Sequence, residues 1–237
     1  MQKEVGWLLK EKYQGKKTKG FYEDIKRLNA GEPLDYVIGF TEFLGFRIDL
    51  SEKPLIPRPE TEFWVGQAIE TILAFCRMQE CVETRKIKIL DIFAGSGCIG
   101  IAISRHVKNA KVDFADKYKY FDSPNFIKSD VFSNIKGKYD YIFANPPYIP
   151  QNRKSKVGES VLKFEPKSAL FGGKDGFFYI RKFLKQAKNY LNPSGRIFME
   201  FSPEQKKEIG KIIKKNSYKK YEFHRDQYGR YRWLVVG

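Results

Sequence analysis

The chain has no apolar run approaching the roughly 20 residues needed to cross a bilayer, and its first twenty residues carry too many lysines for a secretory signal. Cysteine and histidine are scarce, with three and two copies in 237 residues. Cys76, Cys81 and Cys98 are odd in number and lack Cys-x-x-Cys spacing, so we expect reduced thiols in a cytoplasmic protein, without a disulfide framework or metal site. His106 and His224 are isolated in the sequence, and we expect structural or surface roles for both.

Negative charge is also in short supply, because 28 Asp and Glu residues face 44 Lys and Arg residues and leave a net charge of +16. A surplus of this size attracts polyanions, above all nucleic acid, and speeds encounters with acidic partners. The lysines are spread along the whole chain, however, so a genome-wide compositional bias accounts for them equally well. A ribosome or RNA contact through the basic surface therefore stays open.

Apolar residues nevertheless make up 42% of the chain, enough for a substantial core. Weak helical patterning over residues 1–30 predicts two short helices separated by "GKKTKG". The stretch 36–50 is rich in β-branched and aromatic residues and predicts a hairpin, and Pro59 suits the first position of a following helix. We therefore divide the chain into a short N-terminal helical segment at 1–34, a β-hairpin linker at 35–58 and a main domain at 59–237.

Within the main domain, strand and helix patterns alternate. Strands are predicted at 86–93, 111–116, 125–132, 139–145, 195–202, 218–226 and 231–237, and helices at 97–107, 176–191 and 203–216. This alternation predicts an α/β fold with a mostly parallel sheet covered on both faces. Ligands of such sheets bind outside the carboxyl ends of the strands.

Four successive strand ends carry polar or glycine residues suited to a ligand. Asp91 leads into the turn Gly95–Gly97, and the next strands end at Asp116, Asp130 and Asn145. A carboxylate in the position of Asp116 accepts both hydroxyls of a ribose, and Asp130 is placed to accept from an exocyclic adenine amine. The set indicates a pocket for an adenosine-containing ligand.

The glycine turn narrows the choice of that ligand. A dinucleotide site needs G-x-G-x-x-G at this turn, but Phe93 and Ala94 occupy it, the third glycine is misplaced and no Walker lysine follows. A ligand with adenosine and no phosphates fits better, and S-adenosylmethionine is such a ligand.

The motif "NPPY", Asn145 to Tyr148, resembles the signature of methyltransferases that modify planar amide or amine nitrogens. The blocks "GEPLDYVIG", "LIPRPETE", "FEPKSALFGGKDG", "EFSPEQ" and "DQYGRYRWLVV" are similar to the HemK/PrmC family of protein-(glutamine-N5) methyltransferases acting on peptide-chain release factors. The resemblance covers roughly residues 20–237. It implies a Rossmann-like class I S-adenosylmethionine-dependent methyltransferase with a seven-stranded sheet, preceded by a helical domain that docks the release factor.

The resemblance and the strand ends together imply a set of site residues. The expected cofactor contacts are Asp91, Phe93, Ala94, Gly95, Ser96, Gly97, Asp116, Asp130, Val131 and Asn145. The expected substrate is the glutamine of a Gly-Gly-Gln motif, whose two amide N–H groups are gripped by the side-chain oxygen of Asn145 and the carbonyl of Pro146. Pro146 and Pro147 each hold the preceding residue extended, and Tyr148 is expected to cover the amide.

The sequence departs from the family pattern in three places. Phe93 replaces the first glycine of the usual turn, and the N-terminal domain is cut to about thirty residues. Only residues 117–129 separate Asp116 from Asp130, too few for a helical crossover, so we expect an irregular link there. Tyr118, Tyr120 and Phe121 are candidates to fill the space that a helix would occupy.

Two rival functions stay open at this point. A nucleic-acid adenine-N6 or guanine-N2 methyltransferase would share "NPPY" and use the positive charge, although no base-recognition domain is evident. A non-catalytic protein that binds the ribosome or RNA would tolerate Phe93 and the short link. The segment "LIPRPETE" likewise has two interpretations, a helix start or a wall of the acceptor channel.

Overall fold

The computed structural model describes residues 2–78 and 86–237, so the prediction for Cys81 lies outside the described residues. The helices are α1 Gln2–Glu11, α2 Lys19–Asn29, α3 Leu34–Ile38, α4 Pro59–Met78, α5 Cys98–His106, η1 Gln151–Lys156, α6 Glu159–Phe164, α7 Lys167–Leu170, α8 Phe178–Gln186, η2 Ala187–Tyr190, η3 Pro203–Gln205 and α9 Lys206–Lys215. The strands are β1 Phe40–Phe43, β2 Phe46–Asp49, β3 Ile87–Ile92, β4 Ala110–Asp116, β5 Phe126–Lys128, β6 Tyr139–Ala144, β7 Leu191–Glu200, β8 Tyr221–Arg225 and β9 Tyr231–Val236.

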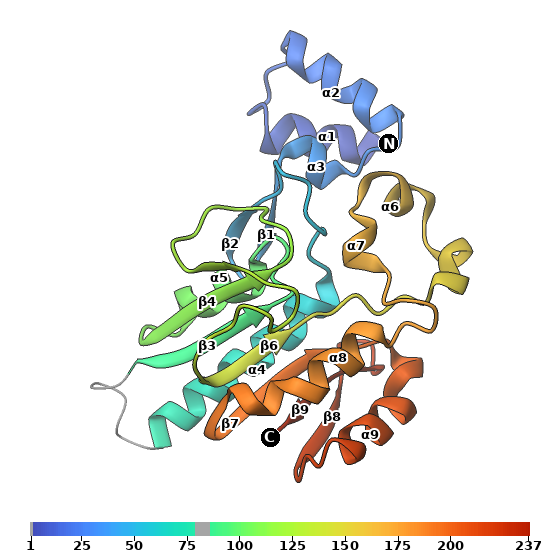
Figure 1. The fold of residues 1–237 in the computed structure, drawn as a ribbon. Helices are drawn as coiled ribbons and strands as arrows, with labels where there is room; N and C mark the ends of the chain where they lie inside the picture. Colours follow the sequence, from blue (N-terminus) through green and yellow to red (C-terminus); the bar gives the residue numbers. More distant parts are fainter. Residues whose placement is uncertain (1, 79–85) are drawn as a thin grey trace.

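The central sheet has seven strands in the order β5-β4-β3-β6-β7-β9-β8 (Figure 1). Neighbouring strands from β5 to β7 are parallel, and β9 runs antiparallel to both β7 and β8. The predicted mostly parallel sheet is therefore confirmed. Because the chain leaves β3 toward β4 and returns on the other side through β6, the strand order reverses between β3 and β6, where ligands of such sheets bind.

Both faces of the sheet are covered, as the alternation of strands and helices predicts. Helices α4 and α5 and the β1–β2 hairpin pack on one face, where Trp64 and Phe143 are fully buried. Helices α8 and α9 pack on the other face against residues such as Leu90 and Ile142 (Figure 1). Adjacent residues of one strand, such as Ile142 and Phe143, enter opposite cores, which is the period of an extended chain buried on both sides.

The expected irregular link between β4 and β5 is confirmed, since residues 117–125 form no helix. Phe121 packs edge-on against Phe114 at 5.1 Å and Phe126 at 5.9 Å between ring centroids. A Cβ atom on Gly97 would lie 2.6 Å from the ring of Phe121, so this packing requires glycine at the start of α5. The aromatic ring thus fills part of the space that a crossover helix would take.

The N-terminal helices form a small unit with a core of their own, made by Leu8, Phe21, Leu28 and Val37. Helix α3 was not expected, because residues 36–38 were assigned to the hairpin. Its apolar stretch is too short to show a helical period, and packing on α1 and α2 determines its conformation. We propose that this unit ends at Ile38 and not at residue 34.

The N-terminal unit contacts the linker and the main domain through the polar turn between α2 and α3. The carboxylate of Glu32 accepts hydrogen bonds from Arg27 and from Lys53, both at 2.9 Å. On the other side the Ser160 hydroxyl of α6 donates to the Gly31 carbonyl at 2.8 Å. Helix α6, η1 and α7 lie between β6 and α8, and their four to six residues each are too short to give a periodic signal in the sequence.

Candidate functional site

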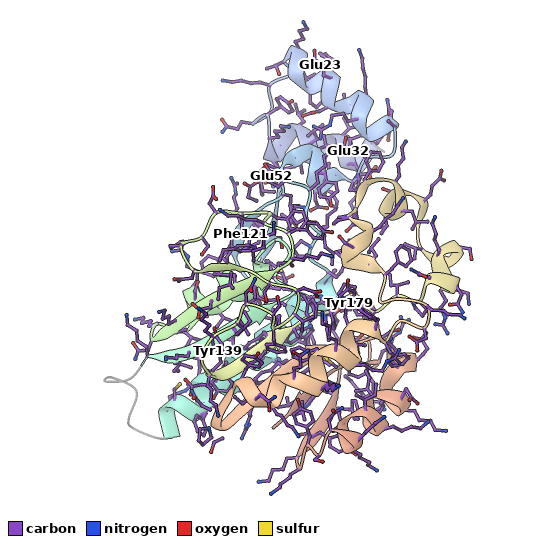
Figure 2. All side chains as sticks on the ribbon, in the orientation of Figure 1. Glu23, Glu32, Glu52, Phe121, Tyr139 and Tyr179 are labelled. Carbon is purple, nitrogen blue, oxygen red and sulfur yellow. The ribbon has the colours of Figure 1, made fainter. Side chains whose placement is uncertain are left out.

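A pocket opens at the carboxyl ends of β3, β4 and β6, where the strand order reverses. Its lining combines the turn after β3, the end of β4, the start of the β5–β6 connection, Asn145 and the segment before α4, and Tyr179 reaches it from α8 (Figure 2). Of the residues predicted for the site, the lining includes Phe93, Ala94, Gly95, Ser96, Asp116, Asp130, Val131, Asn145 and Pro147.

The turn after β3 has a strained backbone at the edge of the pocket. Phe93 has φ 63°, the left-handed conformation that glycine adopts most easily, and Gly95 and Gly97 follow with φ 52° and 77°. The Phe93 ring lies edge-on to Tyr179 at 5.8 Å and to Phe183 at 6.1 Å. Aromatic packing on α8 therefore offsets the strain of a side chain where the family pattern has glycine.

Asp116 bridges the two strand ends. Its Oδ2 accepts the Gly95 N–H at 2.9 Å and its Oδ1 accepts the Tyr118 N–H at 3.0 Å. Burial raises the pKa of this carboxyl, while these backbone donors act in the opposite direction. A carboxylate has about four acceptor positions, so these contacts leave the carboxylate with capacity to accept from a ligand hydroxyl. The residue therefore fits a ribose with two adjacent hydroxyls.

Asp130 and Val131 follow β5 at the same edge. Asp130 pairs with Lys182 of α8 at 2.9 Å and lines the pocket. Val131 has φ 57°, which is unusual for a β-branched residue, and its carbonyl accepts the Ser129 hydroxyl at 2.7 Å. Positive φ at both Phe93 and Val131 marks the pocket as the strained part of the sheet edge.

Four predicted site residues lie outside the pocket lining of the described chain. Asp91 is fully buried and accepts the Gly100 N–H at 2.9 Å, so its observed contact is with α5. Gly97 packs against Phe121, as described above. Pro146 is buried between two residues that do line the pocket. Tyr148, expected to cover the substrate amide, donates its hydroxyl to Glu200 at 3.1 Å.

Asn145 is held by a chain of hydrogen bonds that the sequence did not reveal. Its Nδ2 donates to Thr61 Oγ1 at 3.4 Å, and the Thr61 hydroxyl donates to Glu200 Oε2 at 2.6 Å. The indole N–H of Trp64 donates to the same oxygen at 2.7 Å. Glu200 is the last residue of β7. Ligands of such sheets bind at the carboxyl ends of the strands, so extending the search for polar strand-end residues to β7 would have identified it.

The Glu200 carboxyl is 1% exposed, and burial raises its pKa. The hydrogen bonds from Thr61 and Trp64 and the positive charge of Arg232 act against burial and favour the carboxylate. Burial and the charge of Glu200 together raise the pKa of Tyr148, so the phenol stays protonated and donates.

The loop that follows "NPPY" is clamped by backbone contacts. The Ile149 N–H donates to the Leu170 carbonyl at 3.0 Å, and the Gly172 N–H donates to the Ile149 carbonyl at 2.9 Å. A Cβ atom on Gly172 would lie 2.4 Å from the Pro147 carbonyl oxygen, so the approach is open only to glycine. The Gln205 side chain donates to the Tyr148 carbonyl at 3.1 Å.

The segment "LIPRPETE" both begins a helix and forms part of the pocket wall. Pro59 begins α4, and residues 55–58 together with Thr61 line the pocket. Glu165 fixes this wall, because its buried carboxylate accepts the Ile56 N–H at 3.1 Å and pairs with Arg58 at 2.7 Å. The two interpretations left open by the sequence therefore describe the same segment.

The comparisons with known proteins agree with this geometry. The release factor glutamine methyltransferase of Streptococcus pneumoniae strain R6 is 35% identical over 96% of this chain and 83% of its own length. The protein of the same name from Lactococcus lactis is 34% identical over 98% of this chain and 88% of its own. No protein-family model matches the chain.

Solved structures show the same fold at low sequence identity. The ribosomal protein L11 methylase of Lactobacillus delbrueckii has a TM-score of 0.50 at 16% identity and covers 78% of this chain and 80% of its own. The Mtq2–Trm112 complex of E. cuniculi, described as responsible for methylation of the eRF1 translation termination factor, gives a TM-score of 0.53 at 16% identity, with 76% and 96% covered.

The seven-stranded sheet and the pocket at its switch point give the chain the fold of the class I S-adenosylmethionine-dependent methyltransferases. Within that class, the chain belongs to the release factor glutamine methyltransferase family. Among the helices of the described chain, none is long and apolar enough to cross a membrane. The cofactor is S-adenosylmethionine, and the pocket residues fit it, since Asp116 keeps acceptor capacity for a ribose and no phosphate-binding lysine motif accompanies the turn.

We propose that Asp116 binds the ribose hydroxyls. Replacing Asp116 by Ala should then weaken S-adenosylmethionine binding by about 1.5–3 kcal/mol, because a charged acceptor is lost from two hydrogen bonds. Isothermal titration calorimetry measures the change. Asp122→Ala is the matched control, since the Asp122 side chain is 98% exposed and outside the pocket. An unchanged Kd for Asp116→Ala would place the ribose elsewhere.

Proposed function

We propose that this protein transfers the methyl group of S-adenosylmethionine to the N5 amide of the glutamine in the Gly-Gly-Gln motif of a peptide-chain release factor. The observation that carries the proposal is the position of Asn145, which lines the same pocket as Asp116 and is anchored through its own NH₂ group to Thr61. Its side-chain oxygen is then the atom available to accept an N–H from a substrate. The names of the relatives support glutamine as the methylated residue.

The chemistry requires positioning, because an amide nitrogen is a poor nucleophile. Its lone pair is delocalised into the carbonyl, and an amide rotation barrier of about 18–20 kcal/mol bounds the strength of that delocalisation. S-adenosylmethionine supplies an electrophilic methyl group on sulfur. The protein's own contribution is to accept both N–H bonds of the glutamine, one at Asn145 Oδ1 and one at the Pro146 carbonyl, and so to aim the nitrogen.

The prolines support this assignment of acceptors. Pro147 keeps Pro146 extended, and an extended carbonyl is free of helical pairing. The clamp on the following loop, from Gly172 and Gln205, keeps the main chain in place. No general base is assigned, because the nitrogen proton becomes acidic as the N–C bond forms and leaves afterwards. Orientation of this kind accounts for up to roughly 7–11 kcal/mol of a reaction barrier.

We further assign the other pocket residues by position. Asp130 and Val131 are proposed to hold the adenine, and the turn residues Gly95 and Ser96 are proposed to face the methionine end of the cofactor, where Gly95 permits close approach. Tyr148 is assigned to the support of the site through Glu200 in place of direct contact with the substrate.

The first test concerns the chemistry. Asn145→Ala removes one of two acceptors, so kcat should fall on the order of 100-fold with a smaller change in KM. Methyl transfer is measured by mass spectrometry on a release factor, its Gln→Glu form and an adenine-bearing oligonucleotide. Asn125→Ala, an exposed amide outside the pocket lining, is the matched control and should keep the wild-type rate.

Two results would contradict this function. One is methyl transfer to the oligonucleotide, which would favour the nucleic-acid rival. The other is transfer to the Gln→Glu protein at the wild-type rate, because a carboxylate offers no N–H to the two acceptors.

The second test concerns the partner. Exposed cations lie in the segment after "NPPY", at Arg153, Lys154 and Lys156 in η1 and farther along at Lys163 and Lys167, of which Lys167 directly precedes the pocket residue Ser168. We propose that these cations guide an acidic surface of the release factor, or of a ribosome that carries it, toward the pocket. The kcat/KM on an intact release factor should then fall as salt rises, while a short uncharged Gly-Gly-Gln peptide should respond little.

Charge-reversal variants test whether the cations of η1 cause this salt dependence of kcat/KM. Lys154→Glu with Lys156→Glu should lower kcat/KM on the intact protein at low salt and flatten its salt dependence. The control pair Lys207→Glu and Lys214→Glu carries the same change in net charge on exposed positions of α9. If both variant pairs change kcat/KM equally, or if protein and peptide respond equally to salt, the proposal is wrong. The net charge would then reflect only a compositional bias.

A further inference from the structure

The buried carboxylate of Glu200 connects to both ends of "NPPY". It accepts the Tyr148 hydroxyl at Oε1 and, through Thr61 on Oε2, reaches the side-chain amide of Asn145. Trp64 donates a third hydrogen bond to Oε2. These contacts join α4, β7 and the end of β6, three elements far apart in the sequence. One buried carboxylate is therefore connected to both Asn145 and Tyr148, directly to the tyrosine and through Thr61 to the asparagine.

The direction of each hydrogen bond in this chain follows from its chemistry. An ionised carboxylate only accepts, and the Trp64 indole only donates. The Thr61 hydroxyl has a single proton, and at 2.6 Å it donates that proton to Glu200. Thr61 Oγ1 can therefore meet Asn145 only as an acceptor, so the group that Asn145 presents to Thr61 must be its NH₂.

This polarity decides what Asn145 offers to a substrate. The two ends of an asparagine amide have nearly the same shape, and packing alone distinguishes them poorly. With the NH₂ end committed to Thr61, the oxygen is the end left for the pocket. With the amide reversed, the pocket would meet two N–H donors, which repel the N–H groups of a glutamine amide. Thr61 and Glu200 therefore decide whether Asn145 presents an acceptor or a donor to the pocket.

We propose that Thr61 and Glu200 are positioning residues that fix the orientation of the Asn145 amide, with Glu200 setting the direction of the hydrogen-bond chain. The proposal rests on the proposed function for its kinetic consequence, but the orientation of Asn145 is a property of the protein alone. Burial strengthens the preference for this orientation of the Asn145 amide. Glu200 and Thr61 are 1% and 2% exposed, so water has little access to replace a lost hydrogen-bond partner.

The test uses Thr61→Val, which keeps a similar shape and removes the hydroxyl, and Thr61→Ser, which restores it. Thr61→Val should lower kcat on release-factor glutamine about 10- to 100-fold with a smaller change in KM, and Thr61→Ser should recover most of that loss. Thr71→Val is the matched control on α4, because the Thr71 hydroxyl is exposed and donates to the Gln67 carbonyl. If Thr61→Val does not fold, as judged by its melting curve, Thr61→Ala takes its place.

A second readout is independent of any substrate. In a ¹⁵N-labelled protein the side-chain NH₂ signals of Asn145 are identified by their absence from Asn145→Ala. Their hydrogen bond to Thr61 should shift one proton and slow its exchange with water in wild type and Thr61→Ser, and both effects should vanish in Thr61→Val.

These outcomes separate the two proposals. Wild-type kcat or unchanged Asn145 NH₂ signals in Thr61→Val would overturn the positioning role, and so would an equal loss of kcat in Thr61→Ser. Absence of glutamine methylation by the wild-type protein would overturn the proposed function, and the NH₂ signals would still decide the orientation of Asn145.

Discussion

A carboxylate buried between the sheet and α4 is the constraint on which the site depends. Removing Glu200 from water carries a large desolvation cost, which is offset only if its oxygens are fully hydrogen-bonded. Thr61, Trp64 and Tyr148 provide those bonds, and Arg232 adds a favourable charge. Because Thr61 and Trp64 belong to α4 and Tyr148 belongs to the "NPPY" segment, satisfying the carboxylate also brings these two parts of the chain together. The desolvation of Glu200 is therefore offset only when the "NPPY" segment is in its ordered position.

The fold supplies the rest of the geometry. Parallel strands end at one edge, so Asp116, the residues after β5 and Asn145 meet around a single pocket. The loop after "NPPY" is held by backbone hydrogen bonds, because Gly172 lets two backbone segments approach to hydrogen-bonding distance. The end of the pocket proposed to hold the cofactor is strained at Phe93 and Val131, whereas Asn145, the proposed acceptor, is held by hydrogen bonds. The two ends are stabilised by different means.

Much of this could be predicted from the sequence, because strands buried on both faces and residues at strand ends leave a local signal. The sheet and the irregular link after Asp116 follow from such patterns, and nine of the pocket residues follow from the strand ends together with the family resemblance. Helix α3 and the short helices between β6 and α8 could not be found, since four to six residues do not show a period. Thr61 and Glu200 lie 139 positions apart, and only the folded chain shows that they meet. The hydrogen bond from the Tyr148 hydroxyl to Glu200 likewise joins residues 52 positions apart, and no local pattern indicates it.

A double-mutant cycle tests the central claim most directly, namely that Thr61 acts on catalysis through Asn145. The kcat for release-factor glutamine is measured for wild type, Thr61→Val, Asn145→Ala and the double variant. If Thr61 only orients the Asn145 amide, its loss has no further effect once that amide is gone, so the double variant should match Asn145→Ala within about twofold. Losses that multiply in the double variant would show that Thr61 and Asn145 act independently, and would contradict the account.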